Sequence, residues 1–295
     1  MHAAPRHTAH HHHARPRVAR LRVRALCSVV LWDLRPSLDA AERCGREATI
    51  TSPYRVLATN KHLHAKGIFS LHEMAGSVLT AGKDGYAATC ALTPTGFAGK
   101  RSFDVGMRML KTARWRDAHS FACAGQSHDI AIIDTRAAES SGASLRIDNA
   151  HASGMVSDVR WSPCDEHLLL TSGKDMEMLL HDVRAPGRDV VRLRGHARSM
   201  AKRGNPIFTP TFSHGGRAVT ALGHGSNRLS LFSVASGAMV WEASTKDERG
   251  QPRELMLDGA QVHALRFGGA GEAADEALVL ADGKHVEILP PLAAR

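Results

Sequence analysis

One stretch decides the fold of this chain: residues 151–184, which read HASGMVSDVRWSPCDEHLLLTSGKDMEMLLHDVR. Its apolar runs are separated by a Ser-Pro turn at Ser162-Pro163 and by a Gly-Lys-Asp turn over Gly173–Asp175. Short apolar runs bounded by turn residues of this kind predict antiparallel strands. The stretch therefore predicts one complete module, with strands over 155–161, 167–172 and 176–181 and a closing Asp182-Val183-Arg184.

Related patterns recur along the chain at roughly 40 residues, an interval that indicates the blades of a β-propeller. Five repeats are recognisable, over about 62–94, 106–136, 151–184, 195–234 and 262–289. We expect Trp161 and Phe212 to be largely buried between blades, because each ends an inner strand with a bulky apolar residue. The other predicted strands are 67–71, 77–81, 86–92, 121–124, 130–133, 207–212, 218–222, 229–234, 262–267, 278–280 and 286–289, with outer strands at 190–194 and 239–243.

Only the end of a blade, the strand Val29–Asp33, precedes Pro36. Known propellers close about four to eight blades into a ring. Closure matters because an open edge strand invites aggregation. Five repeats and one partial blade leave the ring short or barely complete. The predicted fold class is therefore an all-β propeller with a partial N-terminal blade, truncated or incompletely closed.

The first 25 residues differ in composition from the rest. They hold six arginines and no acidic residue, in a chain whose net charge is +9 at pH 7. A segment with few large apolar residues cannot offset the entropy lost on ordering, so we predict a disordered basic tail over 1–25 and a propeller domain over 26–295. An electrostatic case for nucleic-acid binding rests on this tail alone. The alternatives are a chain that starts inside a blade, a mitochondrial targeting segment and a nucleic-acid-binding arm.

Two dipeptides resemble signatures of the WD-repeat β-propeller family: Trp32-Asp33 at a blade end and Gly195-His196 at the start of the fourth repeat. In that family a Trp, a Ser or Thr, a His and a turn Asp form a buried hydrogen-bond chain within a blade. The resemblance implies that His151, Ser172 and Asp175 form most of this chain here. We interpret these residues as structural, because such a chain satisfies buried polar groups.

Three blade ends carry an aspartate two residues before an arginine, in the pairs Asp33 and Arg35, Asp134 and Arg136, and Asp182 and Arg184. The first resembles the Trp-Asp-x-Arg box of WD-repeat substrate receptors of cullin–RING ubiquitin ligases, whose Arg helps to dock the receptor on a propeller-shaped adaptor. The resemblance implies Asp33, Arg35, Arg136 and Arg184 as partner-docking residues on one face of the disc. An arginine there can make a bidentate contact with a partner's carboxylate. The alternative is that each arginine pairs only with local acids or backbone.

Catalytic and metal-binding patterns are not evident in the sequence. The 19 histidines place no His-x-x-x-His pair on a predicted helix, and His62 and His64 alternate without a third ligand. The five cysteines are scattered and form no C-x-x-C pair, which fits a reducing compartment, the cytoplasm or nucleus. No apolar run reaches the length of a transmembrane helix. We therefore predict no enzyme activity, cofactor or metal.

The predicted function is that of a non-catalytic WD-repeat scaffold that binds other proteins. Two alternatives stay open. One is a substrate receptor of a cullin–RING ubiquitin ligase that docks on its adaptor through the Asp-x-Arg motifs. The other is a nucleic-acid- or histone-associated WD-repeat protein.

Overall fold

The computed structural model describes residues 19–24, 28–33, 55–137, 143–194, 210–213, 215–222, 228–244, 264–268, 277–281 and 286–289. All 22 regular elements in these ranges are β-strands, and they form six antiparallel sheets. The predicted all-β class is therefore confirmed.

The first three sheets contain β1 (Ala19–Arg24), β2 (Ser28–Asp33) and β3 (Arg55–Asn60); β4 (Ile68–Met74), β5 (Ser77–Gly82), β6 (Tyr86–Thr93) and β7 (Gly96–Asp104); and β8 (Leu110–Trp115), β9 (Ser120–Gly125), β10 (Ile130–Asp134) and β11 (Leu145–Ile147). The other three contain β12 (Val156–Trp161), β13 (Leu168–Gly173), β14 (Met178–Asp182) and β15 (Asp189–Leu193); β16 (Thr211–Phe212), β17 (Ala218–Leu222), β18 (Arg228–Ser233) and β19 (Met239–Ser244); and β20 (Ala264–Gly268), β21 (Ala277–Ala281) and β22 (Val286–Leu289).

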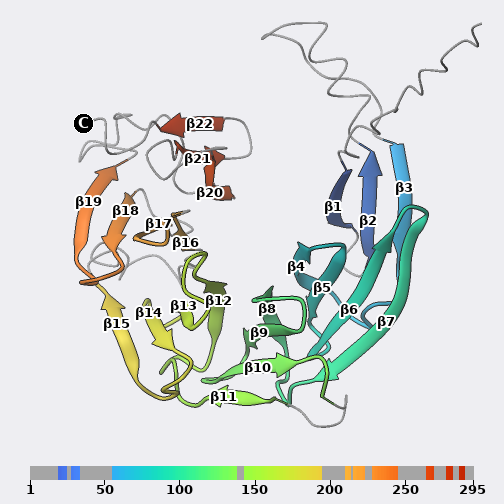
Figure 1. Ribbon diagram of the computed structural model, residues 1–295, viewed down its shortest axis with the longest axis horizontal. Helices are drawn as coiled ribbons and strands as arrows, with labels where there is room; N and C mark the ends of the chain where they lie inside the picture. The colour runs from blue at the N-terminus through green and yellow to red at the C-terminus, as the bar shows by residue number, and fades with distance from the viewer. Residues whose placement is uncertain are drawn as a thin grey trace, which may run out of the picture.

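The sheets follow one another around an arc, with β1–β3 and β20–β22 at its two ends (Figure 1). Within each four-stranded sheet the strands are neighbours in chain order. The first strand, such as β4, β8 or β12, lies on the inner side of the arc, and the fourth lies on the outer side. This arrangement is compatible with a β-propeller, and its described strands form an open arc.

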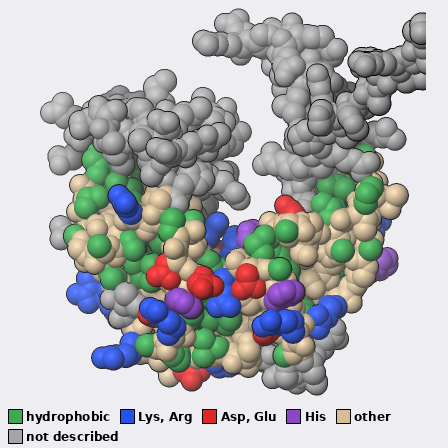
Figure 2. Space-filling view, viewed as in Figure 1, with side chains coloured by type: hydrophobic (Ala, Val, Ile, Leu, Met, Phe, Trp, Pro, Cys, Tyr) green, Lys and Arg blue, Asp and Glu red, His purple; other side chains and the backbone are tan. Residues whose placement is uncertain are grey.

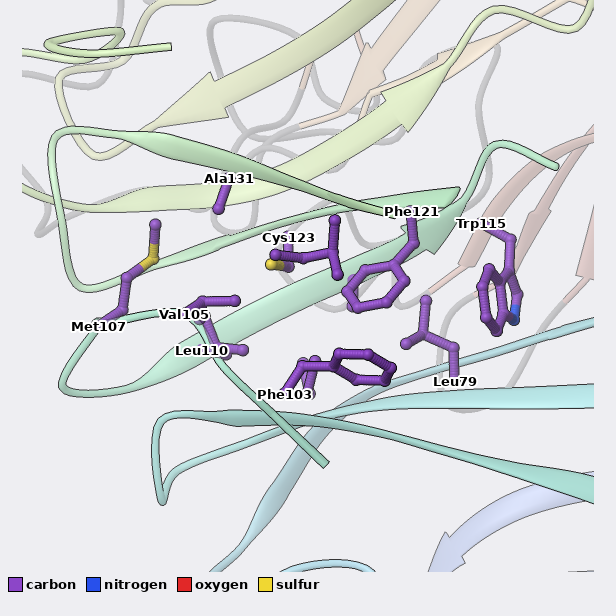
Figure 3. Close-up of a cluster of buried hydrophobic side chains, with 13 residues drawn as sticks. Leu79, Phe103, Val105, Met107, Leu110, Trp115, Phe121, Cys123 and Ala131 are labelled. Atoms are coloured by element: carbon purple, nitrogen blue, oxygen red, sulfur yellow. The ribbon is translucent and has the colours of Figure 1, made fainter. Parts of the chain in front are cut away.

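The core lies in layers between neighbouring sheets. Between β4–β7 and β8–β11, the ring of Phe121 makes edge contacts with Phe103 and Trp115, with centroids 5.5 and 5.4 Å away (Figure 3). Similar apolar layers separate β8–β11 from β12–β15 and β12–β15 from β16–β19. Each middle strand is thus covered on both faces, which explains why all six residues of β9 are buried. A strand that is buried on both faces favours an unbroken run of apolar residues over a strict alternation of apolar and polar residues.

The main differences from the predicted strands lie at the edges of the sheets. Strands β3, β7, β8 and β11 are additions to the prediction; in β7, β8 and β11, polar residues interrupt the apolar pattern. The predicted strand 207–212 is present only as β16, and 207–209 lie outside the described residues.

Strand β1 falls inside the predicted disordered tail and corrects that boundary. It pairs with β2 so that Leu21 lies opposite Leu31 and Val23 opposite Val29. The apolar residues of β1 alternate with arginines, which is the period of a strand, although the arginine content of the whole segment indicates disorder. The rest of the predicted tail, 1–18 and 25, lies outside the described residues.

Candidate protein-interaction face

A buried hydrogen-bond chain ties together the sheet β12–β15. The ring of His151, whose side chain is fully buried, lies 3.0 Å through Nδ1 from Asp175 Oδ1 and 2.8 Å through Nε2 from Thr171 Oγ1. Thr171 Oγ1 is in turn 3.0 Å from His181 Nε2. A carboxylate only accepts hydrogen bonds, so His151 Nδ1–H donates to Asp175. The chain therefore joins the segment before β12 to β13, β14 and the turn between them.

The hydroxyl that contacts His151 corrects one detail of the sequence interpretation. It belongs to Thr171 rather than to the predicted Ser172. Successive side chains of a strand point to opposite faces of the sheet, so only one of these two neighbours can share the face of His151. The sequence alone does not fix that face, because both neighbours carry a hydroxyl group. In the structure both side chains are fully buried.

A second hydrogen-bond chain of the same kind lies in the sheet β4–β7, and the sequence alone did not predict it. His64 Nδ1 is 2.9 Å from Asp84 Oδ1, and His64 Nε2 is 2.8 Å from Thr80 Oγ1. The signal that could have found it is the turn Gly82-Lys83-Asp84, which repeats the Gly-Lys-Asp of residues 173–175. The glycine of this turn is required by close approach, because a Cβ on Gly82 would collide with the ring of His64.

The turn aspartates of the two hydrogen-bond chains, Asp84 and Asp175, are electrostatically stabilised as carboxylates. Burial alone would raise the pKa of Asp175, but its hydrogen bond and charge interaction with His151 outweigh burial and lower the pKa. The pKa of Asp84 is lowered in the same way by His64, against the same burial. These residues are engaged inside the fold, so the structural role inferred for His151 and Asp175 fits their contacts.

The Asp-x-Arg elements after β10 and β14 form two turns with matching geometry. In each, the backbone N–H of the arginine donates to the aspartate Oδ1 at 2.9 Å, and Nε donates to the same oxygen at 3.0 Å. A terminal nitrogen of each guanidinium donates to Oδ2 at 2.6 Å. The side chains of Arg136 and Arg184 nevertheless remain 69% and 63% exposed. Each arginine is thus both locally paired and open to solvent.

The pairing strongly favours the charged form of the two aspartates. The hydrogen bond from the Arg184 side chain, followed by that from its backbone, lowers the pKa of Asp182 to about 2. The same interactions from Arg136 lower the pKa of Asp134. Both ion pairs therefore persist throughout the physiological pH range. Asp33 ends β2, but its side chain and Arg35 lie outside the described residues.

Topology places the two described Asp-x-Arg turns on one face. Strands β10 and β14 are each the third strand of their sheets, and the turns after first and third strands of an antiparallel sheet lie at the same end. The turns after β8 and β12 join them there: Asp117 accepts the His119 N–H at 2.7 Å, and Asp165 accepts the His167 N–H at 2.9 Å. We call the face formed by these four turns the Asp-x-Arg face. Figure 2 shows how acidic, basic and histidine side chains gather in the middle of one face of the arc.

Other chemistry in the described residues is limited. No three side chains of His, Cys, Asp and Glu come together there as metal ligands. Burial raises the pKa of the Cys90 thiol to about 11 and that of the Cys123 thiol to about 12, so neither forms a thiolate at neutral pH. Within the same ranges, no helix is long and apolar enough to cross a membrane.

Comparison with known proteins identifies a fold rather than a family. No family model matches the chain, and no curated protein matches it in sequence. Among solved structures, the chain is similar to a crystal structure of Raptor from Chaetomium thermophilum, with a TM-score of 0.64 over 90% of this chain and 11% sequence identity. The match covers 22% of that Raptor chain. The likeness shows that this succession of antiparallel sheets has a counterpart within part of a larger protein.

Proposed function

We propose that this chain forms a WD-repeat β-propeller that acts as a non-catalytic scaffold for other proteins. The two His–Thr–Asp chains support the WD-repeat part of the proposal. They occupy equivalent places in β4–β7 and β12–β15, and they join the same parts of a blade that the family's buried chain joins. His181 stands in the place of the family's Trp and continues the chain through Thr171.

The observation that carries the scaffold proposal is the pair of solvent-facing Arg–Asp turns on one face. Each aspartate holds Nε and one terminal nitrogen of its arginine, so the guanidinium has a fixed direction before any partner arrives. Within the described residues, the remaining terminal nitrogen of Arg136 and of Arg184 makes no hydrogen bond. A preorganised donor loses less conformational entropy on binding than a free arginine. Two such donors one blade apart offer a rigid two-point contact.

A second candidate follows from the same turns: a substrate receptor of a cullin–RING ubiquitin ligase. The exposure of Arg136 and Arg184 favours it, because docking requires an accessible arginine at this position. The local carboxylates weigh against a contact driven by net charge, since each arginine is already neutralised by the aspartate two residues before it. A planar hydrogen-bonding contact with backbone carbonyls of a partner suits such a neutral pair better than an ion pair does.

The test compares partners captured by the full chain with those captured by Arg136→Ala/Arg184→Ala, using affinity purification and quantitative mass spectrometry. The control is Lys83→Ala/Arg108→Ala, which removes two exposed charges from the opposite face. Truncation of exposed side chains usually changes stability by less than about 0.5 kcal/mol, so all three proteins should unfold at similar temperatures. We expect a set of partners that the turn variant loses and the control retains.

The outcomes separate the candidates. If no captured protein depends on the two arginines, the scaffold proposal is wrong for this face. If the proteins lost from the turn variant include a propeller-shaped ligase adaptor with its cullin, the second candidate holds. If they do not, the second candidate is excluded and the general scaffold stands.

A further inference from the structure

A pocket of about 200 Å³ lies at the centre of the Asp-x-Arg face. Its walls come from the ends of the inner strands β4, β8, β12 and β16 and from the turns that follow β12 and β16. The principal lining residues are His72, Arg114, Trp115, Arg160, Trp161 and Phe212. Phe212 is buried as predicted, whereas Trp161 is only partly buried because it borders this pocket.

The pocket carries more basic than acidic groups. Asp158, which is nearly buried, accepts a hydrogen bond from Arg160 Nε at 2.8 Å and lies 3.6 Å from a terminal nitrogen of Arg114. It also accepts the Thr112 hydroxyl proton at 2.9 Å. One carboxylate thus faces two guanidinium groups. Within the described residues, the two terminal nitrogens of Arg160 make no hydrogen bond, and the side chain is 27% exposed at the pocket.

The aromatic wall of the pocket is fixed in place. The indole N–H of Trp161 donates to the backbone carbonyl of Arg114 at 3.1 Å, and the guanidinium of Arg116 lies 5.5 Å above the ring. On the neighbouring inner strand, the backbone N–H of Trp115 donates to His72 Nδ1 at 3.0 Å, so the neutral ring of His72 carries its proton on Nε2. The pocket is therefore preorganised, with apolar sides and donor groups.

Size decides what class of ligand fits. Pockets for drug-sized molecules are usually about 300–1,000 Å³, larger than this one. A single long side chain, with an apolar stem against the tryptophans and a charged end at Arg160, matches the volume. The guanidinium of Arg160 repels cationic side chains, including methylated lysine, although the aromatic residues by themselves would suit one.

We infer that this pocket receives one anionic side chain, a carboxylate or a phosphate group, from a protein bound on the Asp-x-Arg face. The inference rests on the proposed scaffold function, because it names the chemistry of a partner for that face. The terminal nitrogens of Arg160 present the two donors of a bidentate contact with such a group.

The test uses the full chain labelled with ¹⁵N-tryptophan, which gives one indole signal for each of its four tryptophans. The Trp161 signal is assigned with Trp161→Phe. The probes are capped tripeptides, Ala-Glu-Ala and Ala-phosphoserine-Ala, beside neutral Ala-Gln-Ala and cationic Ala-trimethyllysine-Ala. We expect both anionic probes to shift the Trp161 signal saturably and the other two to leave it unchanged. The tighter of the two anionic probes identifies carboxylate or phosphate as the natural group.

Variants of Arg160 test the contact itself. Arg160→Gln should raise the Kd of the tighter anionic probe about tenfold or more, the effect of losing charge-assisted hydrogen bonds. Arg160→Lys keeps the charge but loses the planar fork, so its Kd should fall between those of the wild type and Arg160→Gln. If Arg160→Gln disturbs the other indole signals, Arg160→Lys decides. Arg188→Gln, at an exposed arginine outside the pocket, is the matched control and should bind like the wild type.

Three results would overturn the inference: saturable binding of the trimethyllysine probe, equal binding of anionic and neutral probes, or no effect of the Arg160 variants. Arg136→Ala/Arg184→Ala should leave the titration unchanged, because those arginines lie outside the pocket. Loss of probe binding with intact partner capture therefore counts against the pocket alone. If the probes bind but no captured partner depends on Arg136 and Arg184, the result counts against the proposed function alone.

Discussion

Replacing Asp175 with alanine tests the buried hydrogen-bond chain most directly. The side chain of Asp175 is 15% exposed and accepts hydrogen bonds from His151 Nδ1 at 3.0 Å and from the backbone N–H of Glu177 at 3.2 Å. The side chain of His151 has no exposed surface, so its Nδ1–H depends on this carboxylate as its acceptor. Leaving one buried donor unsatisfied costs about 1–3 kcal/mol, and we expect Asp175→Ala to lower the free energy of unfolding by about 2 kcal/mol.

The measurement is urea-induced unfolding followed by circular dichroism, which gives the midpoint and the dependence on urea concentration. Asp175→Asn keeps an oxygen acceptor for His151 and should cost less than about 1 kcal/mol. Asp148→Ala removes an exposed aspartate and should stay within about 0.5 kcal/mol of the wild type. The reasoning is refuted if Asp175→Ala is as stable as Asp148→Ala, or if asparagine costs as much as alanine.

Three other predictions follow from the same structure. Gly173→Ala should destabilise the fold by about 1–3 kcal/mol, because the new Cβ would collide with the ring of His151 and with Asp175; an unchanged melting temperature would contradict this. The folded-state pKa of Asp175 is below its ordinary value of 3.8, so its contribution to stability is present above about pH 4 and is lost as the pH falls through the folded-state pKa. Asp175→Ala should therefore be less sensitive to acid than the wild type over that range, as measured by urea midpoints between pH 5 and pH 2. Cys164 is exposed and Cys123 buried, so an alkylating reagent should label Cys164 in the native protein and Cys123 only after unfolding, as peptide mapping will show.

The Asp-x-Arg turns show why a short motif can be read correctly and still leave its role open. Each arginine pairs with the aspartate two residues earlier, which is a local contact. Arg136 and Arg184 are each paired locally and exposed to solvent. The geometry therefore fits a purely local role and also leaves both arginines accessible. Under the proposed scaffold function, a partner would meet a rigid hydrogen-bonding group rather than a free positive charge.

Sequence by itself determined the features of this protein that depend on neighbouring residues. Turn chemistry and apolar runs of strand length are local properties, so the class was predictable, as were most of the strands within 151–184. The turn position of Asp175 was readable for the same reason, because a Gly-Lys-Asp turn between two apolar runs has few other interpretations.

Only the tertiary structure decided which residues meet across the sheets. It selected Thr171 over Ser172 as the partner of His151, because the face of a strand that meets a neighbouring segment depends on register. It brought Arg114 and Arg160 to a shared Asp158 from two different inner strands, and no spacing in the sequence marks that meeting. Turns and strands follow from interactions a few residues apart, whereas the pocket exists only because whole sheets stack side by side around an arc.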